Sequence, residues 1–158
     1  MRLSSTAFEE NAAIPASYTC DGANVNPPLS ISGVPSGAKS LVLILDDPDI
    51  PQAAKDALHA EAFDHWVVFN IPPETTELLQ NMKPGGTEGD NTAGTLGYTG
   101  PCPPDREHRY FFKLYALDAK LTLPSGALRQ DVEQAMDGHV IESAELVARY
   151  QRPQSAVQ

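Results

Sequence analysis

The chain has 158 residues and a formal net charge of −10, from 21 acidic and 11 basic side chains, and 41% of its residues are hydrophobic. This length predicts one domain over residues 1–158, which can bury about two-thirds of its unfolded surface without disulfides or a structural metal. The acidic excess disfavours binding to nucleic acid, because phosphates are repelled unless the few basic residues gather in one patch. Any site for an anion must therefore be local.

No segment of the sequence predicts membrane insertion or export. The longest apolar run, Leu41 to Leu45, is far shorter than the about 20 residues of a spanning helix, and residues 1–10 lack a basic region followed by an apolar core. We therefore expect a cytoplasmic protein. For that location the default expectation for Cys20 and Cys102, which have no CxxC or zinc-type spacing, is two reduced thiols.

The first three predicted elements are two strands with a helix between them. Residues 39–45 form a short run of leucine and β-branched residues between turn residues, which predicts a strand buried on both faces. Residues 52–63 follow a proline and repeat their apolar residues at about helical spacing, which predicts a helix. Residues 65–71, with the sequence HWVVFNI, predict a second buried strand that ends at two prolines.

The last three predicted elements are a strand, a helix and a further strand. Residues 108–117 alternate so that one face of the predicted strand is wholly apolar. Residues 126–137 predict a helix with Ser125 as the candidate N-cap and Gly138 as the residue that stops it. Residues 145–151 also alternate, which favours a strand and leaves a helix as the alternative.

The order and number of these elements predict the fold class. The 11 glycines and 14 prolines gather between the apolar runs, as in proteins made of strands and turns. Strands outnumber helices, and no regular alternation of strand and helix occurs, which disfavours a doubly wound parallel sheet. We therefore predict a mainly β protein, an antiparallel β-sandwich with a few short peripheral helices.

Polar residues stand at the ends of two predicted strands. The DDPD sequence at residues 46–49 follows the strand at 39–45, and its carboxylates could bind a cation, orient a histidine or form an ordinary turn. His65 begins the strand at 65–71, where it could equally be a strand-end residue bonded to backbone. Taken alone, neither feature identifies a site.

The loop before the strand at 108–117 is more informative. Residues 97–107 are stiffened by proline, so such a loop can hold backbone N–H groups towards a ligand at little entropic cost, although an ordinary stiff connection fits as well. His108 and Tyr110 then share one strand face, and Arg109 points to the other. No GxSxG nucleophile elbow and no HExxH zinc helix occurs, so the sequence lacks the commonest hydrolase motifs.

Six motifs in the same chain resemble one known family. They are TCDGANVNPPL at 19–29, DDPD at 46–49, DHWVVFNIP at 64–72, GYTGPCPP at 97–104, HRYFFKLYALD at 108–118 and GHVIESAEL at 138–146. The chain resembles the phosphatidylethanolamine-binding proteins, also called Raf kinase inhibitor proteins, in their bacterial and archaeal branch.

The resemblance implies a β-sandwich with a small pocket at one edge that holds phosphate, acetate or a phospholipid headgroup. The residues implied to line this anion pocket are Asp47, His65, Gly100, Pro101, His108 and Tyr110. The connection at residues 50–64 is longer than in many members and could cover the pocket mouth.

The resemblance also bears on the cysteines and on partners. Cys20 and Cys102 belong to loop motifs that flank the same pocket, so we expect them to be near each other, with bonding under oxidation left open. The family further implies a homodimer and regulation of a kinase or a protease.

The sequence thus favours a non-enzymatic binding protein without cofactor, metal or stable membrane insertion, whose ligand is a small anion or a phosphorylated molecule. Two imidazoles, a phenol and loop N–H groups are donors for an anion, and no obvious nucleophile accompanies them. One alternative is a phosphate-ester hydrolase in which His65 and His108 act as general acid and base, with Asp47 and a metal. The other is a protein-interaction module with a relic pocket.

Overall fold

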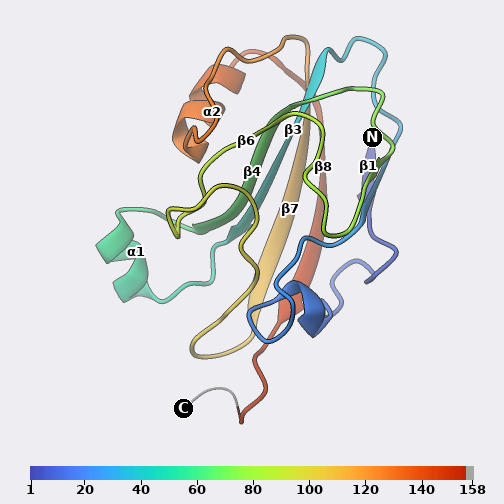
Figure 1. The fold of residues 1–158 in the computed structure, drawn as a ribbon. Helices are drawn as coiled ribbons and strands as arrows, with labels where there is room; N and C mark the ends of the chain where they lie inside the picture. Colours follow the sequence, from blue (N-terminus) through green and yellow to red (C-terminus); the bar gives the residue numbers. More distant parts are fainter. Residues whose placement is uncertain (156–158) are drawn as a thin grey trace.

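The computed structural model describes residues 1–155 as two antiparallel sheets with α-helices beside them (Figure 1). The large sheet contains, in spatial order, β6 (Thr87–Glu88), β4 (Phe63–Ile71), β3 (Ser40–Asp47), β7 (His108–Leu117) and β8 (Val140–Tyr150). The small sheet contains, in spatial order, β1 (Arg2–Ser4), β2 (Leu29–Ser32) and β5 (Glu77–Leu78). All neighbouring strands of both sheets run antiparallel. The predicted mainly β, antiparallel architecture is confirmed.

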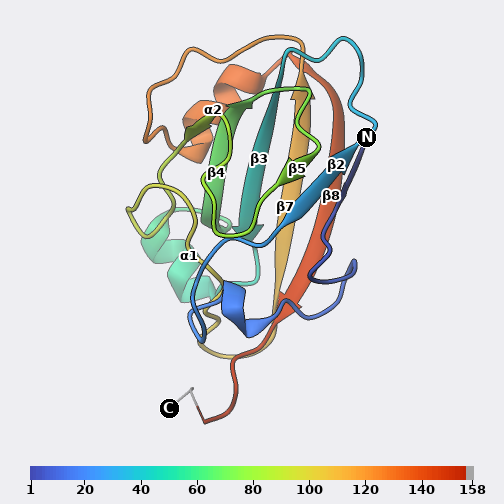
Figure 2. The ribbon, with the colours of Figure 1, turned by 45° about the vertical axis from the view of Figure 1, so that its right-hand side comes forward.

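The large sheet is buried on both faces, which explains the continuous apolar run in β3. Leu41, Leu43 and Leu45 of β3 pack in the core between the two sheets. Val42 and Ile44 point the opposite way, into a second core under α2 (Arg129–Met136). Figure 1 accordingly shows α2 and β1 on opposite sides of the large sheet, and Figure 2 shows β2 and β5 in front of it.

Both helices are shorter than the sequence predicts. Helix α1 (Gln52–Leu58) ends five residues early, because His59 adopts a left-handed conformation with φ 52° and Phe63 belongs to β4. Helix α2 begins only at Arg129, and its N-cap is Leu128 rather than Ser125. None of the residues of α1 is buried, so its regularly spaced apolar residues do not pack into the core.

Strand β8 confirms the strand interpretation of the C-terminal segment and extends it. It begins at Val140, five residues earlier than predicted, because it pairs with β7 from Leu117↔Val140 to His108↔Tyr150. Gly138, with φ 79°, separates α2 from this strand, as predicted. The short strands β1, β2, β5 and β6 were not predicted, although the alternating LSIS sequence of β2 is a strand signal.

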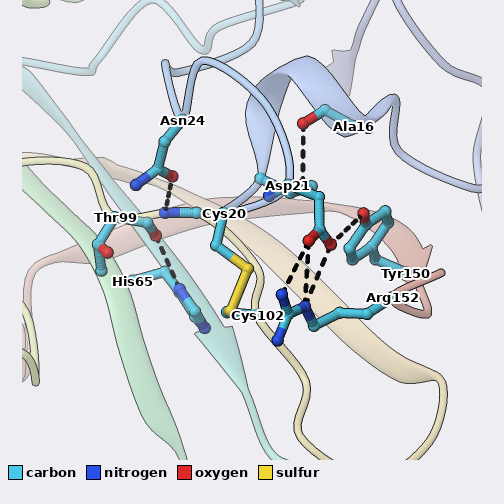
Figure 3. The surroundings of a disulfide bond; sticks show 11 residues. Ala16, Cys20, Asp21, Asn24, His65, Thr99, Cys102, Tyr150 and Arg152 are labelled. Carbon is cyan, nitrogen blue, oxygen red and sulfur yellow. Dashed lines mark hydrogen bonds and ion pairs between the residues drawn. A yellow bond between two sulfur atoms is a disulfide. The ribbon is translucent and has the colours of Figure 1, made fainter. Parts of the chain in front are cut away.

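Cys20 and Cys102 form a disulfide with their Cα atoms 5.5 Å apart, which joins the loop after the short 3₁₀ turn η1 (Ala16–Tyr18) to the loop before β7 (Figure 3). Their predicted proximity is therefore confirmed. The default expectation of two reduced thiols is wrong, because the fold places both cysteines within bridging distance. Among residues 1–155, no helix is long and apolar enough to cross a membrane.

Candidate functional site

Four of the predicted site residues come together where three strands of the large sheet meet. The last residues of β3 lie beside the first residues of β4 and β7, because the strands are antiparallel and in register. Tyr110 belongs to the core between the sheets, and the rings of His65 and His108 lie against it. Asp47, His65, His108 and Tyr110 are between 0% and 5% exposed.

Asp47 fixes the orientation of the His108 ring. Asp47 Oδ2 lies 2.6 Å from His108 Nδ1, and Asp47 Oδ1 accepts a hydrogen bond of 2.7 Å from the N–H of Asp49. Burial raises the pKa of Asp47, while the hydrogen bond with His108 opposes the rise. Because Nδ1 of His108 faces the buried Asp47, its other ring nitrogen, Nε2, points towards the loop before β7.

A second carboxylate meets that other nitrogen. Asp105, in the loop before β7, places Oδ1 2.6 Å from His108 Nε2, and its side chain is 42% exposed. Each short contact needs one proton, so His108 and the two carboxylates share two protons and carry a net charge of −1. No sequence pattern singles out Asp105 as a site residue, although it precedes His108 by three residues.

His65 is buried in a form that carries no charge at neutral pH. Its Nδ1 lies 2.7 Å from the carbonyl oxygen of Thr99, and its ring packs 4.7 Å from that of Phe63 and 5.3 Å from that of Tyr110. Burial lowers the pKa of His65 from 6.5 to about 4. The His65 imidazole therefore stays neutral above about pH 4 and does not supply a positive charge for an anion.

Tyr110 presents an unpaired donor inside the site. Its side chain is fully buried, and its hydroxyl has no hydrogen-bond partner among residues 1–155. Burial raises the pKa of Tyr110, and so do the charge of the nearby Asp47 carboxylate and the interaction of the hydroxyl with it, so the hydroxyl remains protonated. The hydroxyl and the carboxylate are thus close, but their geometry is not that of a hydrogen bond. Its ring stacks on that of His108 with centroids 6.4 Å apart.

The predicted GP turn lies at the site but its amide is already engaged. The N–H of Gly100 donates to Asn24 Oδ1 at 2.7 Å. A Cβ at Gly100 would clash with the carbonyl oxygen of Tyr18 and with Asn24 Oδ1, so only glycine fits this close approach. Pro101 is buried and accepts a 3.1 Å hydrogen bond from the N–H of Cys20. Asn24 lies in the TCDGAN sequence, but nothing in that sequence indicates its contact with Gly100.

Arg109 holds the DDPD turn against β7 from the opposite strand face. Its Nε and Nη2 donate to the two carboxylate oxygens of Asp49 at 2.8 and 2.7 Å. These hydrogen bonds lower the pKa of Asp49 to about 2. The ion pair thereby fixes the turn that supplies the N–H bonded to Asp47.

The long connection at residues 50–64 lies beside a different depression. Residues 58–62 line a hollow of about 690 Å³ next to α2. Asp46, which also lines it, points away from the His108 site and binds Lys113 at 2.8 Å and Arg129 at 2.6 Å. Among residues 1–155, no three His, Cys, Asp or Glu side chains are grouped so that they could hold a metal ion.

The mainly β, antiparallel fold agrees with the comparisons with known proteins. The family described as phosphatidylethanolamine-binding protein matches residues 4–151. The UPF0098 protein of Methanothermobacter thermautotrophicus is 50% identical and covers 96% of this chain and 99% of its own length.

Solved structures agree with this assignment. A phosphatidylethanolamine-binding protein homologue from Chlamydia trachomatis superimposes with a TM-score of 0.91 and 43% identity, over 96% of this chain and 97% of that one. YbcL of E. coli, described as a member of the mammalian family, gives a TM-score of 0.85 and 30% identity, over 96% and 98%. The chain belongs to the phosphatidylethanolamine-binding protein family.

Proposed function

We propose that this protein binds a small oxyanion, such as phosphate or the phosphate group of a phosphorylated molecule or phospholipid headgroup. The proposed site consists of Asp47, His65, Gly100, Pro101, His108 and Tyr110. The observation that carries the proposal is the buried hydroxyl of Tyr110, which makes no hydrogen bond of acceptable geometry among the described residues although the Asp47 carboxylate lies near it. Buried donors in native proteins nearly always have a partner, and a ligand oxygen supplies one here.

The surroundings of Tyr110 support an anionic ligand. His108 Nε2 already accommodates a carboxylate oxygen at 2.6 Å, so the position suits a negatively charged oxygen. Asp47 holds the ring so that Nε2 faces that oxygen. This geometry favours an oxyanion over a neutral ligand.

We further propose that binding is not followed by catalysis. Cys102 is the cysteine of the site loop. It forms a disulfide and therefore has no free thiol to act as a nucleophile. His65 stays neutral at physiological pH and donates to Thr99, so it lacks the arrangement of a general acid. Hydrolysis of p-nitrophenyl phosphate that disappears in His108→Ala would overturn this part of the proposal.

Calorimetric titration with sulfate and phenyl phosphate at pH 7 tests the binding proposal. His108→Ala removes a hydrogen bond to a charged group and should weaken binding by about 1.5–3 kcal/mol. His139→Ala is the matched control, because His139 also pairs with a carboxylate, Asp118, at 2.8 Å but lies at the surface. Measurable binding of equal affinity in wild type, His108→Ala and His139→Ala would refute the site.

Two further ligand preparations separate the sources of the phosphate group. Glycerophosphoethanolamine is a soluble headgroup, and vesicles of phosphatidylethanolamine present the same group at a membrane surface. Binding of phenyl phosphate alone identifies a phosphomonoester site. Binding of the headgroup in either form extends the site to phosphodiesters.

The location and the regulated partner are proposed from the sequence alone. The expected cytoplasmic location predicted reduced thiols, and the disulfide between Cys20 and Cys102 counts against it. Cell fractionation combined with thiol labelling tests it. Regulation of a kinase or a protease follows from the family resemblance, and affinity purification with wild type and His108→Ala tests whether any partner depends on the anion site.

A further inference from the structure

The anion position at His108 is filled by the protein's own carboxylate. Asp105 Oδ1 lies 2.6 Å from His108 Nε2, and the His108 side chain is 0% exposed. His65 and Tyr110 are likewise at most 5% exposed. No external anion can therefore reach His108 while Asp105 stays in place.

Outside Asp105 lies a surface hollow with two guanidinium groups. The hollow, here called the mouth hollow, measures about 470 Å³ and is lined by Pro103, Asp105, Arg106, Gln151, Arg152 and Gln154. The guanidinium of Arg152 is already paired with the carboxylate of Asp21, with Nη2 2.9 Å from Oδ1. Among residues 1–155, Arg106 donates hydrogen bonds to the backbone carbonyls of Glu107 and Asp49, at 3.2 and 3.3 Å, and its Nε lies 4.0 Å from Asp105, so an anion that displaces Asp105 meets this guanidinium.

We propose that Asp105 is an internal competitor for the anion site: a ligand oxyanion enters through the mouth hollow, contacts Arg106 and replaces the Asp105 carboxylate on His108 Nε2. This inference rests on the proposed function and adds the route and the residue that sets the apparent affinity.

The charge balance makes such an exchange feasible. Asp47, His108 and Asp105 together carry a net charge of −1, and replacing the Asp105 carboxylate by a sulfate changes this to −2, an increase that the Arg106 guanidinium offsets. A negative oxygen still faces the His108 N–H after the exchange. The buried imidazole thus keeps a partner for its second nitrogen throughout, which avoids the cost of an unpaired buried donor.

Asp105 is also free to leave. Its side chain is 42% exposed, and its remaining contacts are local: the N–H of Arg106 at 2.9 Å and a distant Arg106 Nε at 4.0 Å. The carboxylate can therefore move into solvent without disturbing either sheet. Asp47 cannot, because it is 3% exposed and holds the N–H of Asp49.

Titration of Asp105→Ala with sulfate and phenyl phosphate tests the competition. If Asp105 occupies His108 for about nine-tenths of the time, its removal should raise the apparent affinity about tenfold. Asp118→Ala is the matched control, because it removes one negative charge from an exposed carboxylate 2.8 Å from a histidine, His139. It should leave the affinity unchanged. Asp105→Asn, which keeps an acceptor but loses the charge, should give an intermediate gain.

The outcomes separate the two proposals. Tighter binding in Asp105→Ala than in Asp118→Ala supports competition, including the case in which wild type binds too weakly to measure. Equal or weaker binding in Asp105→Ala, with wild type binding, overturns competition and leaves the anion site standing. Absence of binding in both wild type and Asp105→Ala overturns the proposed function itself.

The role of Arg106 has its own readout. Arg106→Gln in the Asp105→Ala background should weaken binding several-fold and reduce its dependence on salt, because one guanidinium is lost from the mouth hollow. An unchanged affinity and salt dependence would remove the mouth hollow from the proposed route.

Discussion

The buried, neutral His65 should make the protein less stable as pH falls, over a defined range. An unfolded chain protonates this imidazole near pH 6.5, whereas the folded protein does so only near the lowered pKa of about 4. Between these values the unfolded state binds more protons, so the free energy of unfolding decreases on acidification. The full difference of 2.5 pKa units corresponds to about 3 kcal/mol, and about 2 kcal/mol of it is lost between pH 7 and pH 5.

Urea unfolding of wild type and His65→Asn at pH 7 and pH 5 measures this loss. The asparagine amide can still donate to the Thr99 carbonyl, which accepts from His65 at 2.7 Å, but it does not titrate. Wild type should therefore lose about 2 kcal/mol more than the variant between the two pH values. His139→Asn removes an exposed imidazole and should retain the wild-type loss.

The comparison of variants is needed because carboxyl groups also titrate. Burial raises the pKa of Asp47 and of Asp64, so these groups gain protons in the folded state first and stabilise it on acidification, opposing His65. Asp49, with its pKa lowered to about 2, loses its contribution only below about pH 4, outside the range tested. An equal loss in wild type and His65→Asn would refute the role of His65 burial.

Four other predictions test separate features. Reducing the disulfide, or replacing Cys20 and Cys102 by serine, should lower the free energy of unfolding by about 4 kcal/mol by the chain-entropy model for this loop length, and thiol counting of unreduced, denatured protein should find none; a full complement of thiols would contradict the bond. Tyr110→Phe removes the buried hydroxyl and should weaken sulfate binding about tenfold, or 1.4 kcal/mol; unchanged binding would separate Tyr110 from the anion. Gly100→Ala should destabilise the fold by about 1–3 kcal/mol in thermal unfolding, since its Cβ meets backbone, and a neutral effect would contradict that packing. Light scattering should find a homodimer, whereas a mass near the 17.0 kDa of one chain would remove that prediction.

The sequence by itself determined the main strands and the residues that could form a site. Apolar runs and alternation located β3, β4, β7 and β8, because a strand between two packed layers must be apolar on one or both faces. The motifs likewise singled out the residues around His108. Each of these signals is local, and a single segment carries it.

The tertiary structure decided what those residues do together. The partner of the second His108 nitrogen, Asp105, and the partner of the Gly100 amide, Asn24, depend on how surface loops fold over the sheet end. The disulfide depends in the same way on two loops 82 residues apart in sequence meeting within 5.5 Å. Helix boundaries also changed: the left-handed backbone of His59 ends α1 early, and the positive φ of Gly126 keeps the residues after the candidate N-cap Ser125 out of α2. Contacts between distant loops leave no periodic pattern in a sequence, and burial, which lowers the pKa of His65, is a property of the packed molecule rather than of any segment.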